Sequence, residues 1–134
     1  MEQITLHVEA EINPTEELEK VKKAVNNLFG NISITTKTEG ESCTLTGEAA
    51  GQDSLTKFRN LLRNDRIRDA ARKALLRKIR GNTIGFYLNK QVAYSGHISF
   101  SEETAESPLG PIKIIIETDN PQQLIEWLAE KTER

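Results

Sequence analysis

The feature that most constrains the fold of this chain is a strict alternation of side chains near the N-terminus. In residues 4–12, every second side chain is apolar and those between are polar or charged. Because successive side chains of a strand point to opposite faces, this pattern predicts a strand with one buried face and one wet face. Segments 32–39 and 42–49 have the same half-polar character around a turn at Gly40, and the strongly apolar segment 112–118 predicts a central strand.

Helical patterns lie between these strands. The Asn-Pro pairs at 13–14 and 120–121 combine a capping side chain with a proline suited to the first helical position, so each predicts a helix start. Two more helices are expected at 53–64 and 66–80, with a break at the Asn-Asp pair 64–65.

Residues 82–101 predict further strands, around turns at 89–90 and 95–96. The predicted order is therefore β-α-β-β-α-α-β-β-β-α. Hairpins alternate with helices, which favours an α+β fold: a mostly antiparallel sheet with helices packed on one face. The 134 residues fit one domain, 1–134, which is long enough to bury a core without metals or disulfides.

Some kinds of protein are made improbable by composition. Cys43 is the single cysteine, so the chain forms no internal disulfide, which suits a reducing cytoplasm. The longest apolar run, 84–88, is far too short to span a membrane. We expect a cytoplasmic protein that does not associate with membranes.

Catalytic and cofactor motifs are weak. No histidine is near Cys43 in the sequence, and no glycine-rich phosphate loop is present, so the sequence predicts neither an enzyme nor a cofactor. A metal-dependent enzyme would need His7, Glu9 and His97 to converge on one ion. The acids at 102, 103 and 106 are expected to be solvated.

The strongest signal is an uneven distribution of charge. Residues 57–80 contain ten Lys/Arg against two Asp, a net charge of +8; since the chain totals −2, the other 110 residues carry −10. Such asymmetry indicates a polyanionic partner. The candidate phosphate contacts are Lys57, Arg59, Arg63, Arg66, Arg68, Arg72, Lys73, Arg77, Lys78 and Arg80.

A helical arrangement of residues 66–80 divides this segment into faces. An apolar sector is expected to face the sheet: Ile67, Ala70, Ala71, Ala74 and Leu75. One flank carries a stripe of four cations: Arg66, Lys73, Arg77 and Arg80. Arg68 and Arg72 lie on the other flank. Leu76 and Ile79 point away from the apolar sector, which predicts a contact with a neighbouring helix or a second subunit.

Arginine-rich stripes suit phosphate groups, because a guanidinium can donate two parallel hydrogen bonds to them. The predicted function is RNA binding through the basic helix pair 53–80, by contact with the phosphate backbone of structured RNA, whose deep groove resists reading by side chains. Phe86 is expected in the core, and Tyr87 is a weak candidate for base stacking. The alternative is a protein-interaction module or homodimer that docks the basic helix on an acidic surface such as 102–106.

Two segments resemble a known family: "VEAEINPTEELEKVKKAVNNLF" at 8–29 and "LTKFRNLLRNDRIRDAARKALL" at 55–76. The family consists of small, uncharacterised archaeal proteins described as predicted RNA-binding and exosome-associated. The most specific part is the Arg-Ile-x-Asp-Ala-Ala-Arg run at 66–72. The family fold is similar to that of the five-S-RNA-binding protein of the large ribosomal subunit, so the resemblance implies a ribosomal-protein-like α+β fold and an RNA partner. It carries over no catalytic residue.

Overall fold

The computed structural model describes residues 3–101 and 110–131, and in these ranges an antiparallel sheet is covered by helices. The sheet has the order β2-β3-β1-β7-β5-β4, with β6 also paired to β5. The strands are β1 (Ile4–Ile12), β2 (Ser33–Glu39), β3 (Ser42–Ala50), β4 (Ile79–Arg80), β5 (Thr83–Asn89), β6 (Phe100–Ser101) and β7 (Pro111–Thr118). The helices are α1 (Leu18–Leu28), the 3-10 turn η1 (Gln52–Leu55), α2 (Thr56–Asn64), α3 (Arg68–Leu76), α4 (Lys90–Tyr94) and α5 (Pro121–Leu128).

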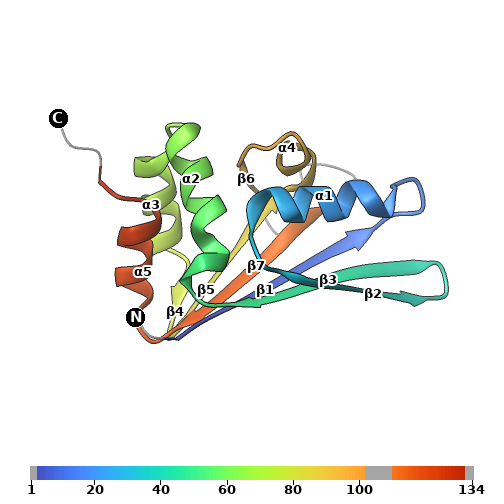
Figure 1. The fold of residues 1–134 in the computed structure, drawn as a ribbon, viewed down its shortest axis with the longest axis horizontal. Helices are drawn as coiled ribbons and strands as arrows, with labels where there is room; N and C mark the ends of the chain where they lie inside the picture. The colour runs from blue at the N-terminus through green and yellow to red at the C-terminus, as the bar shows by residue number, and fades with distance from the viewer. Residues whose placement is uncertain (1–2, 102–109, 132–134) are drawn as a thin grey trace.

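All of these helices lie on one side of the sheet (Figure 1), as the α+β fold class predicted. Figure 1 also shows two groups of helices, one formed by α2, α3 and α5 and the other by α1 and α4. Among the described residues, no helix covers the other side of the sheet, which is called the outer face below. Its alternation is as expected: Leu6 and Val8 of β1 are buried, whereas His7 and Glu9 point outward.

The central position predicted for segment 112–118 is confirmed, because β7 pairs with β1 on one side and β5 on the other. Its inner residues Ile112, Ile114 and Ile116 are fully buried. Under the helices, the four phenylalanines of the chain form a row of ring contacts, with centroid distances of 5.5 Å for Phe29–Phe58, 5.8 Å for Phe58–Phe86 and 5.8 Å for Phe86–Phe100. Phe86 is therefore a core residue, as the sequence predicted.

The two Asn-Pro helix starts have different outcomes. Near the C-terminus the prediction is confirmed, because the Asn120 side chain accepts a hydrogen bond from the Gln123 backbone N–H at 3.1 Å and Pro121 begins α5. Near the N-terminus it is wrong, since α1 begins only at Leu18. There the Glu16 carboxylate accepts hydrogen bonds from the Asn13 backbone and side chain, which stabilises a separate turn before the helix.

Helix α4 corrects the predicted element order. The sequence patterns in 82–101 predicted strands around turns at 89–90 and 95–96, but residues 90–94 are helical because the Asn89 side chain caps them by accepting from the Val92 N–H at 2.9 Å. With the added strand β4 and the 3-10 turn η1, the observed order becomes β-α-β-β-η-α-α-β-β-α-β-β-α.

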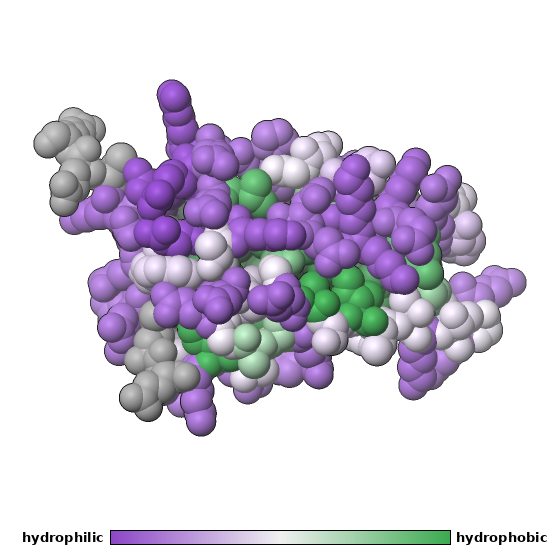
Figure 2. All heavy atoms as spheres, viewed as in Figure 1, coloured by the Kyte–Doolittle hydropathy of each residue, from purple (hydrophilic) through white to green (hydrophobic). Residues whose placement is uncertain are grey.

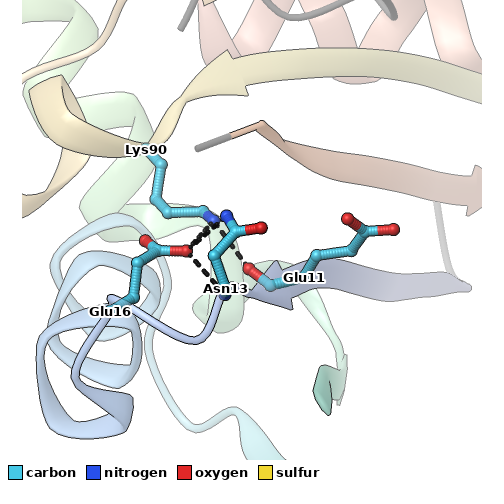
Figure 3. A network of polar contacts seen from close by, with 4 residues as sticks. All are labelled: Glu11, Asn13, Glu16 and Lys90. Atoms are coloured by element: carbon cyan, nitrogen blue, oxygen red, sulfur yellow. Dashed lines mark hydrogen bonds and ion pairs between the residues drawn. The ribbon is translucent and has the colours of Figure 1, made fainter. Parts of the chain in front are cut away.

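A buried ion pair joins α4 to the turn before α1. The Lys90 ammonium donates to a Glu16 carboxylate oxygen at 2.9 Å and to the Glu11 carbonyl at 2.6 Å (Figure 3), and its side chain is only 4% exposed. Burial alone would raise the pKa of the Glu16 carboxyl. The hydrogen bonds from Asn13 and Lys90, with the positive charge of Lys90, outweigh that effect and hold the pKa below its ordinary value.

The helix predicted at 66–80 is shorter than expected. It ends at Leu76, and the chain then forms a hairpin in which Ile79 pairs with Ile84 and Arg80 pairs with Thr83. The two-residue loop between these strands contains Gly81, whose φ of +61° is left-handed, as such loops favour at their first position. Residues 77–80 therefore leave the helix.

In the part of the chain that is described, no helix has both the length and the apolar character needed to cross a membrane.

Candidate nucleic-acid interface

The turn between α2 and α3 positions the basic segment. It occurs at the predicted break: the Arg66 N–H donates to the Arg63 carbonyl and the Ile67 N–H to the Leu62 carbonyl, both at 3.1 Å. These bonds form a Schellman motif, whose left-handed residue is usually glycine. Here that residue is Arg66, with a φ of +59°. Arg66 therefore has a backbone conformation that costs free energy for any residue with a Cβ, and its side chain is exposed.

Asp65 ties this turn to the loop between α4 and β6. One of its carboxylate oxygens contacts the His97 Nδ1 atom at 2.9 Å, and the other accepts the Ile98 backbone N–H at 3.1 Å. Asp65 lies at the predicted break between the two helices, and its long-range contacts hold the turn in place.

Two of the ten cations predicted to contact phosphate donate hydrogen bonds to backbone carbonyls at the C-terminal end of α5. The Arg59 Nε atom donates to the Trp127 carbonyl at 2.9 Å, and the Arg72 Nη1 atom donates to the Ala129 carbonyl at 3.4 Å. The Arg59 guanidinium also lies 5.2 Å from the Trp127 ring centroid. We call Arg59 and Arg72 the inward pair. Because the last carbonyls of a helix lack partners within it, these two guanidinium groups cap the C-terminal end of α5.

Glu130 reduces the net positive charge on the same side. It forms an ion pair with Arg59. The hydrogen bond from Arg59, with the charges of Arg59, Arg63 and Arg68, lowers the pKa of the Glu130 carboxyl. Arg63 and Arg68 thus share their surroundings with an acid, and Lys57 is held by the Asn26 carbonyl at 2.9 Å.

Four cations at the other end of the segment have different surroundings. Lys73, Arg77, Lys78 and Arg80 are all exposed, and within residues 3–101 and 110–131 none of them forms an ion pair. We call these four residues the outward cluster. Arg77 is anchored through Nε to the Lys73 carbonyl at 3.2 Å, and Arg80 through Nη1 to the Ile79 carbonyl at 2.8 Å. Such bonds hold the side chains without neutralising them, because a carbonyl carries no net charge.

A cleft of about 320 Å³ lies beside the outward cluster. It is lined by Ala74, Arg77, Lys78, Arg80, Phe86, Phe100 and Ser101. Figure 2 shows predominantly hydrophilic side chains around α2 and α3 on the helical side. A larger cavity, of about 450 Å³, lies between α1 and α4. Its Lys90 and Glu16 already neutralise each other, so it is a weaker site for an anion.

The continuous helical stripe predicted for Arg66, Lys73, Arg77 and Arg80 is wrong in its geometry. Arg66 precedes α3, Arg77 follows its last residue and Arg80 belongs to β4. In the expected apolar sector, Ala71 and Leu75 are buried but Ala70 is exposed. Leu76 is 38% exposed, as its predicted direction required, whereas Ile79 packs against the core from β4.

The remaining alternatives from the sequence have mixed outcomes. His97 pairs with Asp65, whereas His7 lies on the outer face within 3.3 Å of Glu48, so the proposed metal ligands engage separate carboxylates. Among the residues described, no group of three or more His, Cys, Asp or Glu could hold a metal ion. The acidic segment 102–106 lies outside the described residues. Sequence reasoning missed Lys113 as a surface cation, because it lies 33 residues beyond the basic segment and joins it only through the β5–β7 pairing.

A family model described as RNA binding matches residues 5–118, so the chain belongs to this RNA-binding family. This agrees with the archaeal family resemblance read from the sequence. The family's description concerns binding and names no catalytic activity.

Its similar relatives are uncharacterised archaeal proteins called UPF0201. One from Saccharolobus solfataricus is 45% identical over 129 residues, covering 96% of this chain and 89% of the relative. The crystal structure of a UPF0201 protein from Methanococcus jannaschii has a TM-score of 0.83 and 33% identity, covering 93% of this chain and 98% of the other. A DUF54 protein from Methanothermobacter thermautotrophicus has a TM-score of 0.62 at 15% identity, covering 96% and 99% of the two chains, which shows a shared fold.

Proposed function

We propose that this protein binds the phosphate backbone of structured RNA through the outward cluster, without catalysing a reaction. The observation that carries this proposal is the set of four exposed cations without acidic partners in the described chain, gathered at the end of α3 and on β4. Membership of the RNA-binding family supports the choice of RNA as the polyanion.

Backbone recognition follows from the kind of groups that the cluster presents. Guanidinium and ammonium groups bind phosphates strongly but carry little sequence information when they contact only the backbone. Arg66 extends this surface at the α2–α3 turn. A strained residue that persists in a fold suggests a functional role, and the exposed charge of Arg66 supplies one. Arg63 and Arg68 are secondary contacts, because Glu130 offsets part of their charge.

The test is a double charge reversal, Lys73→Glu with Arg77→Glu. Binding of a labelled RNA hairpin, measured by fluorescence anisotropy at low salt, should fall at least tenfold. The slope of log affinity against log salt should become shallower by roughly two, since about one unit is lost for each phosphate contact. Circular dichroism and the Tm should stay close to wild type, because both side chains are exposed.

A matched control makes the same change of charge on the α1 and β2 sides of the molecule. Lys20→Glu with Lys37→Glu likewise reverses the charge of two exposed cations and should weaken binding by less than threefold. Equal losses in both double variants would mean that net charge alone attracts RNA, and unchanged binding in the Lys73/Arg77 variant would refute the proposed interface.

A further inference from the structure

Tyr87 differs in its surroundings from the other aromatic residues. The four phenylalanines contact one another in the core, Trp127 packs beside Arg59, and Tyr94 lies beside Lys23. Tyr87 is partly exposed on the outer face of β5, and among the described residues its side chain has no ring contact or hydrogen bond. An aromatic ring with one open side is the usual platform for a nucleobase.

A shallow groove of about 270 Å³ lies beside this ring. Its lining includes Lys78, Arg80, Gly85, Tyr87, Lys113 and Ile115. Pockets that enclose a drug-sized ligand usually have volumes of about 300–1,000 Å³, so this smaller, open groove suits one flat group lying on its surface.

Gly85 creates the open floor of the groove. It lies opposite Ile115 in the β5–β7 pairing, and a Cβ built on it would meet no atom within 4 Å. Glycine weakens a strand interior and often marks a place where a ligand approaches the backbone closely. Its φ is outside the left-handed range, so backbone geometry does not require glycine here.

The groove is continuous with the proposed RNA interface. Lys78 and Arg80 line both this groove on the outer face and the cleft beside α3. Strand β4 is only two residues long and lies at the end of the strand order, so these two side chains reach both sides of the sheet edge. A phosphate backbone can therefore pass from α3 over β4 to Tyr87 while remaining in contact with cations.

The charge of the outer face limits where such a strand can lie. Lys113 adds a third cation next to Tyr87, its pairing partner on β5. The other pairing partner of Lys113 is Glu9 of β1, Glu117 of β7 lies opposite Thr83, and Glu11 and Glu48 lie farther across the face. Because these carboxylates repel phosphate, the favourable path is confined to the β4–β5 edge.

We propose that an unpaired nucleotide of the bound RNA lies in this groove, its base stacked on Tyr87 and its phosphates held by Lys78, Arg80 and Lys113. The inference rests on the proposed function and deepens it. The preferred ligand becomes a duplex with a single-stranded extension, in which the outward cluster holds the duplex and the outer face holds the first unpaired base.

The experiment compares a blunt RNA hairpin with the same hairpin carrying a three-nucleotide single-stranded extension. Wild-type protein should bind the extended RNA about tenfold more tightly, as expected from stacking of one base. An extension of abasic nucleotides should lose most of this gain, because it keeps the phosphates but removes the bases. Tyr87→Ala should bind both hairpins equally, whereas Tyr87→Phe should behave like wild type.

Gly85→Val provides a second variant that changes neither the charges nor the tyrosine. Valine suits a strand, so the Tm should be unchanged or raised, but its branched side chain should fill the groove and remove the gain from the extension. The inference is overturned if the extension gives no gain with wild-type protein, or if Tyr87→Ala or Gly85→Val keeps the gain. Loss of blunt-hairpin binding in the Lys73/Arg77 variant tests the proposed function separately, so failure of one idea is distinguishable from failure of the other.

Discussion

Arg72 and Lys73 are neighbours in α3, yet their side chains have opposite surroundings. Arg72 is 16% exposed and contacts the Ala129 carbonyl beyond the end of α5, whereas Lys73 is exposed and forms no ion pair within the described chain. Arg59 resembles Arg72, because both donate to carbonyls at the end of α5. Arg77, Lys78 and Arg80 resemble Lys73, because all four are exposed. The comparison shows that the charge-rich segment contains two populations of cations, one that holds the fold together and one that is available to a ligand.

The populations differ in what a substitution should do. Removing an inward cation leaves helix carbonyls without partners, so the main loss should be in stability. Removing an outward cation leaves an exposed site that water can fill, so the main loss should be in RNA affinity. Substitutions at Lys90, Arg59 and Arg66 test this division, beginning with the cation that is most completely buried.

Lys90→Met should have the largest effect on stability. Lys90 is the extreme case of a structural cation, because its 4% exposed side chain joins Glu16 to the Glu11 carbonyl. Removing one partner of a buried ion pair costs about 3–5 kcal/mol. Chemical denaturation should show a loss of that size, and the double variant Lys90→Met/Glu16→Gln should recover part of it. A loss below about 1 kcal/mol would contradict a structural role for Lys90.

The same ion pair has a defined pH dependence. The native pKa of Glu16 lies below its ordinary value of 4.5, so the unfolded chain takes up this proton first as pH falls. The stabilisation is therefore complete above that ordinary value and is lost as pH falls through the lower native value. Glu16→Gln should remove this part of the acid sensitivity, which stability curves between neutral and acidic pH can measure.

Arg59→Met should have an intermediate effect. The variant loses a charged hydrogen bond to the Trp127 carbonyl and the contact with the Trp127 ring, at an expected cost of about 2 kcal/mol. Lys73→Met is the matched control from the same basic segment, and its stability should change by less than about 0.5 kcal/mol. Glu130→Gln should be milder than Arg59→Met, since it removes an exposed ion pair but keeps the carbonyl bond. Equal losses for Arg59→Met and Lys73→Met would remove the distinction between the populations.

Much of the fold could be predicted because its signals are local. Alternation identified β1, the isoleucines identified β7 as central, and Asn120 with Pro121 identified the start of α5. The errors arose where a short element depends on a few residues. Asn89 starts a helix of only five residues. Gly81 allows the chain to form the β4–β5 hairpin, so residues 79–80 are a strand and not the end of the helix predicted over 66–80.

The two populations of cations could not be separated from the sequence. Arg59 and the Trp127 carbonyl are 68 residues apart, and Arg72 is 57 residues from Ala129. No local pattern indicates that α5 ends beside α2 and α3, so the sequence did not reveal that Arg59 and Arg72 contact this helix end. The groove beside Tyr87 was hidden for the same reason, because it requires β4, β5 and β7 to lie side by side.

Arg66→Gly should have a small effect on stability, with the opposite sign to Lys90→Met and Arg59→Met. Glycine adopts the left-handed conformation of Arg66 readily, so the Schellman motif should become more stable by about 0.5–1 kcal/mol despite the greater freedom of glycine in the unfolded chain. RNA affinity should nevertheless fall, with a salt slope shallower by about one, because an exposed cation is lost.

Arg66→Gln separates the two consequences, since it removes the charge but keeps the left-handed side-chain residue. It should weaken RNA binding as much as Arg66→Gly does, without the gain in stability. Anisotropy titrations and denaturation of both variants provide the measurement. If both variants bind RNA as well as wild type, Arg66 does not belong to the interface. If only glycine weakens binding, the turn matters through its backbone, because both variants lack the charge.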